Sequence, residues 1–205
     1  MKNTTNTETP ASAAVRPAKE WANPTPAGLA SLALVCVCFF ALLTGRVGSG
    51  ALPLLGCWMI GGFVVQVIVA LLDLKGGNSA GGNVFLLFSA FFMLVGGLEM
   101  FVKFGAGIAG IPLDARIDGW AWVVLTLVIW LWSPAFFQKF NLLSIVVILI
   151  DIALPIIALT DLDILAKSWG HVAGWSLLAA GAVAVYLCAA MVVNAAAGKK
   201  IYPVL

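Results

Sequence analysis

The sequence predicts an all-α integral membrane protein with six transmembrane helices and both termini in the cytoplasm. The chain of 205 residues is 62% hydrophobic and only 10% charged, whereas soluble domains carry about 25% charged residues. Its apolar residues also fall into six runs of about 18–25 residues, and a helix of that length spans a hydrocarbon core of about 30 Å. The runs are too long and too uniformly apolar for the strands of a barrel.

Short breaks rich in turn-forming residues separate the six predicted helices. In chain order the breaks read TGRVGSG, KGGNSAGG, GAGIAGIPLDARID, QKFN and TDLDILAKSW, and glycine, asparagine or aspartate occurs in each. None of them has room for a soluble domain. The predicted spans are residues 27–44, 51–74, 82–102, 119–137, 142–159 and 170–194.

The lysine and arginine residues predict the orientation, because cytoplasmic loops carry an excess of them. With both termini in the cytoplasm, seven of these residues lie inside and four lie outside. We therefore expect a multi-pass protein of the plasma membrane, which in a bacterium is the cell inner membrane. The seven are Lys2, Arg16, Lys19, Lys75, Lys139, Lys199 and Lys200, and the four are Arg46, Lys103, Arg116 and Lys167.

Polar sequence flanks the predicted membrane domain on both sides. Residues 1–22 are rich in threonine, alanine and proline and lack the apolar core of a signal peptide, so we predict a disordered cytoplasmic tail. Residues 23–198 form the six-helix transmembrane domain. Residues 199–205 form a second cytoplasmic tail.

The sequence has no signature of a metal site, a cofactor or a nucleic-acid interface. Its net charge is only +2, and no basic patch interleaved with aromatic residues occurs. The four cysteines form no CxxC pair, and the single His171 completes no ligand cluster with them, so we interpret them as apolar packing residues. The cysteines are Cys36, Cys38, Cys57 and Cys188.

Intramembrane proteases are the enzymes that six apolar helices suggest, but their motifs do not match this chain. A serine protease of this kind needs Gly-x-Ser-Gly, and Val47 occupies the first position of the corresponding stretch. An aspartyl protease needs two aspartates within the membrane, and only Asp151 lies at the centre of a span. The sequence therefore predicts a protein that is not an enzyme.

The first predicted helix begins with the stretch NPTPAGL, from Asn23 to Leu29. One interpretation is structural: Asn23 caps the helix, a proline in the first turn needs no N–H, and Gly28 allows close approach. The other is functional. The first turn opens into a water-lined vestibule, where free N–H groups and the positive end of the helix dipole face an anion.

Asp151 lies near the middle of the fifth predicted span. A carboxylate at that depth costs about 2.5–3.5 kcal/mol on insertion scales, so it should face a cavity or a partner. Burial favours the neutral acid, and Pro155 leaves the Asp151 carbonyl without its helical N–H donor. Asp151 is therefore either a proton-linked gate or an acid hydrogen-bonded between helices. The indole N–H of Trp130 also needs a partner from a neighbouring helix or subunit.

Other polar residues within or beside the spans allow two interpretations each. Gln66 either lines a pore or ties helices together. Asp73 is expected to be an interfacial charge at the cytoplasmic rim. Glu99 and Lys103 are four residues apart and predict a local ion pair. His171 opens the last helix, where it either senses pH or packs at the helix end.

Three blocks of the sequence resemble the acetate uptake transporter (AceTr) family, the acetate/succinate permeases. NPTPAGL is similar to the Asn-Pro-Ala-Pro-Leu-Gly-Leu signature of that family. The second predicted helix resembles a family block in Gln66, Asp73, Lys75, Gly77 and Asn78. The last helix is similar to the family's last helix. Its matching residues are His171, Ala173, Gly174, Trp175, Gly181, Tyr186, Leu187 and Asn194.

The resemblance implies a membrane transporter of small carboxylates. It implies a six-helix subunit with its own pore, assembled into a homo-hexamer, that passes acetate and in some members succinate. Passage is by proton symport or through an anion channel. Asp151 and His171 are the proton-linked candidates. With Asp151, which is argued from its depth in the span and departs from the family pattern, the predicted substrate path comprises Asn23, Pro24, Thr25, Pro26, Gly28, Leu29, Leu32, Gln66, Asn78, Phe88 and Asp151. Leu32 stands where the family has a phenylalanine, and Phe88 where it has a tyrosine.

A channel of another class remains an alternative. Six-helix hexameric channels for urea and short amides share the predicted architecture, and an ionised Asp151 would hinder anions. A pH-gated channel for a neutral small solute such as urea or ammonia therefore fits the same helices. Competition separates the two, since acetate should block its own path and leave urea flux unaffected.

Overall fold

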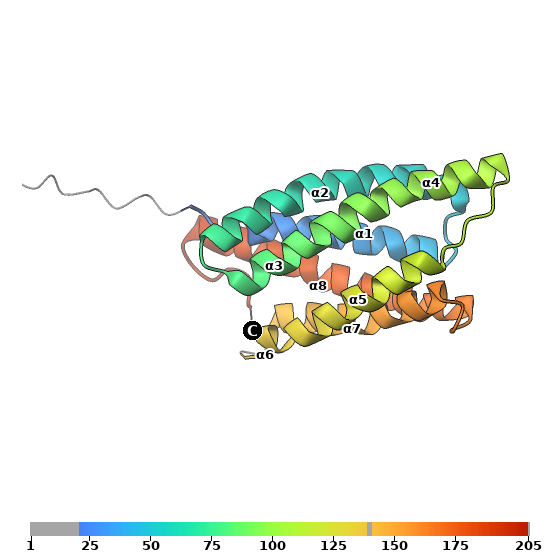
Figure 1. Cartoon of the computed structure of the whole chain (residues 1–205). Helices are drawn as coiled ribbons and strands as arrows, with labels where there is room; N and C mark the ends of the chain where they lie inside the picture. Colours follow the sequence, from blue (N-terminus) through green and yellow to red (C-terminus); the bar gives the residue numbers. More distant parts are fainter. Residues whose placement is uncertain (1–20, 139–140, 205) are drawn as a thin grey trace, which may run out of the picture.

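The computed structural model describes residues 21–138 and 141–204, and within these ranges the chain is helical and contains no strand. Six helical spans are long and apolar enough to cross a membrane, which confirms the predicted all-α membrane architecture (Figure 1). The predicted tail at residues 1–20 and the charge of Lys139 lie outside the described residues. The chain is a multi-pass membrane protein.

The spans agree with the predicted runs to within a few residues at most ends. Both described chain ends, Trp21 and Val204, lie at the same end of the bundle (Figure 1), which we call the terminal end; the opposite end is the far end. The elements are α1 Thr25–Leu43, η1 Ser49–Ala51, α2 Leu52–Lys75, α3 Ser79–Leu87, η2 Phe88–Val95, α4 Gly96–Ala109, α5 Arg116–Trp132, α6 Pro134–Phe137, α7 Leu142–Asp161, η3 Lys167–Trp169 and α8 Gly170–Ala197.

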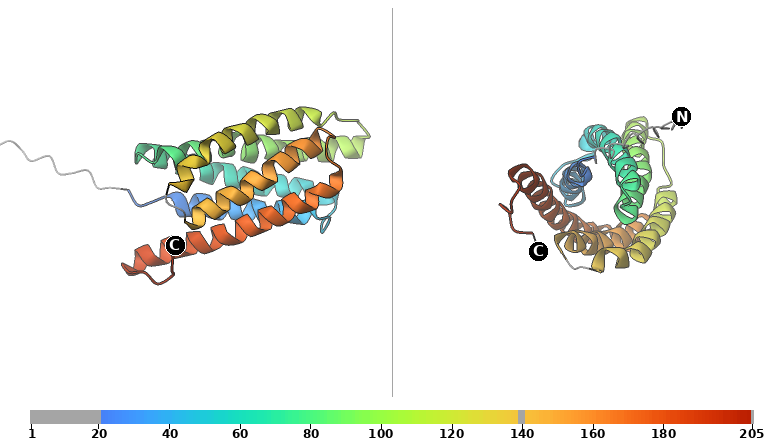
Figure 2. Two further views of the ribbon diagram at one scale, coloured as in Figure 1. Left: turned by 90° about the horizontal axis from the view of Figure 1, so that it is seen from below. Right: turned by 90° about the vertical axis from the view of Figure 1, so that its left-hand side faces the viewer.

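The spans pack as a curved row. In order of packing the row runs α4, α2, α1, α8, α7 and α5, and the end-on view in Figure 2 shows it curling around a centre. The two ends of the row, α4 and α5, face each other across a groove rather than packing closely. The curvature leaves room along the axis of the bundle.

The third span is not one regular helix, contrary to the prediction for residues 82–102. It runs from Ser79 to Ala109, and Phe88–Val95 forms a π-helix between α3 and α4. Such segments are rare and occur often at functional sites. The eight residues FSAFFMLV carry no pattern that separates a π-helix from an α-helix, so the sequence does not reveal the change.

The fourth span breaks before Pro134, which has no N–H to continue the ladder of α5. The short α6 follows, and the turn into α7 is fixed by side chains. The Asn141 side chain accepts a hydrogen bond from the Leu143 N–H at 2.9 Å, and Ser144 Oγ donates to the Phe136 carbonyl at 2.6 Å. These bonds hold α6 beside the start of α7.

The described part of the predicted C-terminal tail folds back onto α8. Asn194 Oδ1 accepts hydrogen bonds from the Ile201 and Tyr202 N–H groups at 2.7 and 2.8 Å. The Tyr186 hydroxyl donates to the Pro203 carbonyl at 2.8 Å. Two residues of the family-like last helix, Tyr186 and Asn194, therefore hold the end of the described chain.

Candidate transport path

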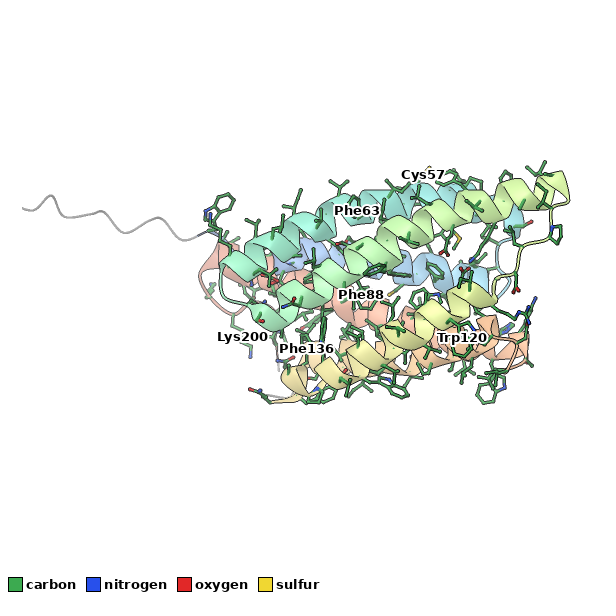
Figure 3. The ribbon with its side chains drawn as sticks, in the orientation of Figure 1. Cys57, Phe63, Phe88, Trp120, Phe136 and Lys200 are labelled. Carbon is green, nitrogen blue, oxygen red and sulfur yellow. The ribbon has the colours of Figure 1, made fainter. Side chains whose placement is uncertain are left out.

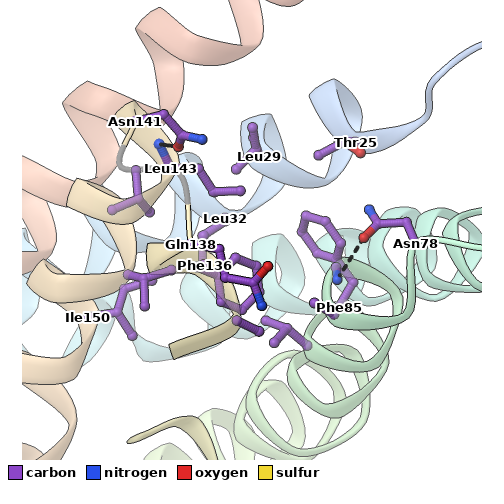
Figure 4. Close-up of a pocket in the computed structure, with 16 residues that line it drawn as sticks. Thr25, Leu29, Leu32, Asn78, Phe85, Phe136, Gln138, Asn141, Leu143 and Ile150 are labelled. Carbon is purple, nitrogen blue, oxygen red and sulfur yellow. Dashed lines mark hydrogen bonds between the residues drawn. The ribbon is translucent and has the colours of Figure 1, made fainter. Parts of the chain in front are cut away.

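A cavity of about 460 Å³ opens at the terminal end of the bundle. We call it the vestibule. α1, α3, α6 and α7 line it mainly with apolar side chains, and its polar groups are uncharged (Figure 4). Their hydroxyl and amide groups can exchange hydrogen bonds with water or with a carboxylate. These polar side chains belong to Thr25, Asn78, Gln138 and Asn141.

The vestibule ends at an apolar constriction inside the bundle. Leu32 and Ile150 line both the vestibule and a second cavity of about 10 Å³ beyond it. That volume is at the lower limit for one water molecule, so the path is closed here. Phe92 lies at the centre of an aromatic cluster, with ring centroids 5.4 Å from Phe39, 5.7 Å from Phe88 and 5.8 Å from Trp122.

Two residues of the implied path, Leu32 and Phe88, therefore meet at this constriction, and both line the small cavity. Phe88 is the first residue of the π-helix and lies near the middle of the bundle (Figure 3). A change between π and α geometry in the third span would move the Phe88 and Phe92 rings.

Two of the backbone N–H groups at the start of NPTPAGL already have acceptors within the stretch. The Thr25 N–H donates to Asn23 Oδ1 at 3.0 Å, Pro26 has no N–H, and the Ala27 N–H donates to the Pro24 carbonyl at 3.1 Å. The N-cap of α1 is Pro24 rather than the expected Asn23, whose side chain forms its hydrogen bond one residue ahead of that position. An anion at these positions would meet side chains and the helix dipole rather than open N–H groups.

Thr25 connects the motif to the end of α2. Its hydroxyl lies 3.3 and 3.4 Å from the two carboxylate oxygens of Asp73. Asp73 is 4% exposed, so the expectation of an interfacial surface charge was wrong. The Asn78 N–H donates to the Asp73 carbonyl at 2.9 Å, and Asn78 Oδ1 accepts from the Gly81 N–H at 3.1 Å. One cluster therefore joins the ends of α1, α2 and α3.

Gly28 and Leu29 serve the packing at the same place. A Cβ on Gly28 would lie 2.7 Å from the Phe85 ring and 3.1 Å from Val69, so only glycine lets α3 approach α1 this closely. Leu29 is buried and lines the vestibule. The residues of NPTPAGL thus shape the vestibule wall while closing the gap between α1 and its neighbours.

Gln66 lies in α2 and is fully buried. Both of its amide atoms lack a hydrogen-bond partner among the described residues. It is not among the residues that line the vestibule or the constriction. Its helix neighbours on either side, Gly62 and Val69, contact Met93 and Gly28, which places Gln66 between the π-helix and the motif.

Asp151 lies between α5 and α7 and is not among the residues that line the vestibule or the constriction. Its Oδ2 is 2.6 Å from Ser133 Oγ, which is also 2.9 Å from the Ile129 carbonyl. A serine hydroxyl has one hydrogen and can donate to only one of these acceptors. A protonated Asp151 would donate to Ser133 and leave that hydrogen for Ile129. This arrangement matches the interhelical interpretation of Asp151.

The Asp151 carbonyl and the Trp130 indole N–H, each predicted to need a hydrogen-bond partner, bind each other. The Trp130 indole N–H donates to the Asp151 carbonyl at 3.0 Å, which is the carbonyl that Pro155 leaves free. The expectation that Trp130 finds its partner on a neighbouring helix is confirmed.

Charged residues gather at the far end. Lys103 Nζ lies 3.4 Å from Glu99 on the same helix, as predicted, and 2.7 Å from Asp118 on α5. The sequence did not reveal the second, shorter contact. His171 is exposed at the start of α8, and its Nδ1 lies 3.3 Å from the Ser168 carbonyl. It is not among the residues that line the vestibule or the constriction.

These features describe a six-helix membrane protein. The structure is similar to the solved structure of the bacterial acetate channel SatP, with a TM-score of 0.77 and 20% sequence identity over 90% of this chain and 99% of that chain. No family model matches the chain, and no curated protein matches it. The likeness confirms the architecture that the resemblance to the acetate uptake transporters implied.

Proposed function

We propose that the chain transports small carboxylates across the membrane, with acetate as the first substrate to test. The observation that carries the proposal is the path through a single six-helix subunit, in which an open vestibule leads to a narrow apolar constriction. The fold that this chain shares with a bacterial acetate channel supports it.

The substrate enters at the vestibule, which we place on the cytoplasmic side together with both termini. There it meets the side-chain amides of Asn78 and Asn141, which form hydrogen bonds without a fixed charge. It then passes Leu32 and Phe88, where it leaves its hydration shell. A small solute crosses such a constriction at the lowest cost, so size selects acetate over longer acids.

Proton symport and an anion channel both fit this path, and succinate is a further substrate to test. The assembly that we propose is a homo-hexamer in the plasma membrane, in which each subunit keeps its own path. In this proposal Asp151 influences the path indirectly, through the packing of α5 against α7. Its carboxyl contacts Ser133 and does not line the constriction. His171 is the second proton-linked candidate.

One observation favours a second function. The described residues that line the constriction are apolar apart from the thiol of Cys36 and the indole of Trp122, and such a filter also passes neutral solutes. A pH-gated channel for urea or ammonia is therefore the alternative, and competition between acetate and urea distinguishes it.

The test is uptake of labelled acetate into proteoliposomes at several external pH values, for the wild type and for Asp151→Asn. We expect wild-type uptake to exceed that of empty liposomes and to rise as the pH falls. If Asp151 couples the proton, Asp151→Asn abolishes the pH dependence; if it only joins helices, the dependence remains. Uptake equal to that of empty liposomes at every pH overturns the acetate assignment, and urea and ammonia are then tested.

A further inference from the structure

Four charged side chains from three spans meet at the far end of the bundle. Lys103 of α4 lies 2.7 Å from Asp118 of α5 and 3.4 Å from Glu99. Asp161, the last residue of α7, precedes Leu162, which packs against Gly119 beside Asp118: a Cβ on Gly119 would lie 2.7 Å from the Leu162 side chain. All four are at least partly shielded from solvent. We call this group the far-end charge cluster.

Helical spacing places the cluster directly beyond the apolar constriction. Asp118 is one turn from Trp122 on α5, and Asp161 is one turn from Ile157 on α7; Trp122 and Ile157 both line the constriction. Residues four apart share a helix face. The charged side chains of Asp118 and Asp161 therefore lie on the same faces of α5 and α7 as the residues that line the constriction.

The cluster also bridges the open side of the curved row. α4 and α5 are separated along their length by a groove of about 250 Å³, lined by apolar residues together with Glu99 and Asp118. Among the described residues, one ion pair crosses this groove and joins the two spans: Lys103 with Asp118. This ion pair therefore holds α4 and α5, the first and last spans of the row, together at the far end of the bundle.

We propose that Lys103, with Glu99, Asp118 and Asp161 around it, is a lock that closes the far end of the path. The Lys103 ammonium contacts the carboxylates of Glu99 and Asp118, and Asp161 lies at the adjoining end of α7, so Lys103 holds the cluster together. When the cation is absent, the carboxylates repel one another and separate α4, α5 and α7. This inference rests on the proposed function, since it assigns a gate to the same path.

Accessibility of Cys36 tests the lock without any transported substrate. Cys36 is 1% exposed and lines the small cavity of the constriction, so it reports whether water-soluble molecules reach that point. A chain with Cys38→Ser, Cys57→Ala and Cys188→Ser keeps it as the single described thiol. In lipid nanodiscs, the rate of its reaction with a charged methanethiosulfonate reagent is measured by mass spectrometry.

We expect Lys103→Met to raise the reaction rate of Cys36 by about fivefold or more, the factor that about one lost stabilising contact gives. Asp118→Asn should raise it less, because one fewer carboxylate then opposes closure. Lys103→Arg keeps the charge and should resemble the wild type. Arg116→Gln is the matched control, because the ion pair of Arg116 among the described residues is with exposed Asp114 at 2.6 Å, outside the cluster.

An unchanged rate in correctly folded Lys103→Met overturns the lock, and so does an equal rise in Arg116→Gln. If Lys103→Met does not fold, as judged by size-exclusion chromatography, Asp118→Asn decides, since it keeps the size of the side chain. Failure of wild-type acetate uptake would overturn the proposed function and leave this measurement intact.

Discussion

The two ends of the path offer different polar groups to a solute. The vestibule at the terminal end presents the uncharged side chains of Thr25, Asn78 and Asn141. The far end presents one ammonium and three carboxylates, of which Lys103 and Asp118 are 2.7 Å apart. Uncharged groups exchange hydrogen bonds with a solute at little cost, whereas paired charges hold each other in place.

This difference assigns separate tasks to the two ends. In our proposal the terminal end receives the carboxylate, because its amide side chains are uncharged and are not held in ion pairs. The far end is closed by attraction between spans that otherwise face each other across a groove. The apolar constriction between them requires a solute to shed water. The predictions below test each part of the comparison in turn.

The largest effect is expected at the boundary between vestibule and constriction. Leu32→Trp places an indole ring in place of a smaller aliphatic side chain, beside a cavity whose volume is only about 10 Å³. We expect acetate uptake into proteoliposomes to fall about tenfold or more, because pore size controls passage. Leu34→Trp is the control, since Leu34 lies two residues away on the exposed side of α1. If both variants lose the same amount of acetate uptake, the constriction at Leu32 is not part of the transport path.

A smaller effect is expected where the motif meets α2. Thr25→Val removes the hydroxyl that contacts the buried Asp73. Leaving a buried acceptor without its donor costs about 1–3 kcal/mol, so the thermal midpoint of the purified protein should fall by a few degrees. Thr25→Ser should restore it. Thr44→Val is the control, because the Thr44 hydroxyl donates to the Phe40 carbonyl of its own helix. If Thr44→Val lowers the thermal midpoint as much as Thr25→Val does, the contact of Thr25 with Asp73 makes no special contribution to stability.

The sequence predicted the spans well because their length and apolar character follow from the thickness of a bilayer. It also predicted that the Asp151 carbonyl and the Trp130 indole each need a partner, since Pro155 and hydrogen-bond chemistry demand it. It did not predict that they bind each other. That pairing depends on the lateral packing of α5 against α7, which no local pattern encodes.

The candidate site was predicted only in part for the same reason. Leu32 and Phe88 share the constriction as the family resemblance implied, while Asp151 lies at another helix contact. The π-helix that begins at Phe88 has no sequence signature. The ion pair between Lys103 and Asp118 joins spans that are distant in packing order, so helix spacing found only the contact with Glu99.

The smallest effect is expected for the exposed pair beside the far-end charge cluster. Arg116 donates two side-chain hydrogen bonds to Asp114 and lowers the pKa of that carboxyl to about 2. A lowered pKa favours the folded state above the ordinary value near 4, and this contribution is lost only as the pH falls toward 2. Asp114 therefore stays ionised from pH 5 to 8. We expect Asp114→Asn to leave the pH profile of acetate uptake unchanged in that window. A shifted profile would show that far-end charges outside the cluster also control the path.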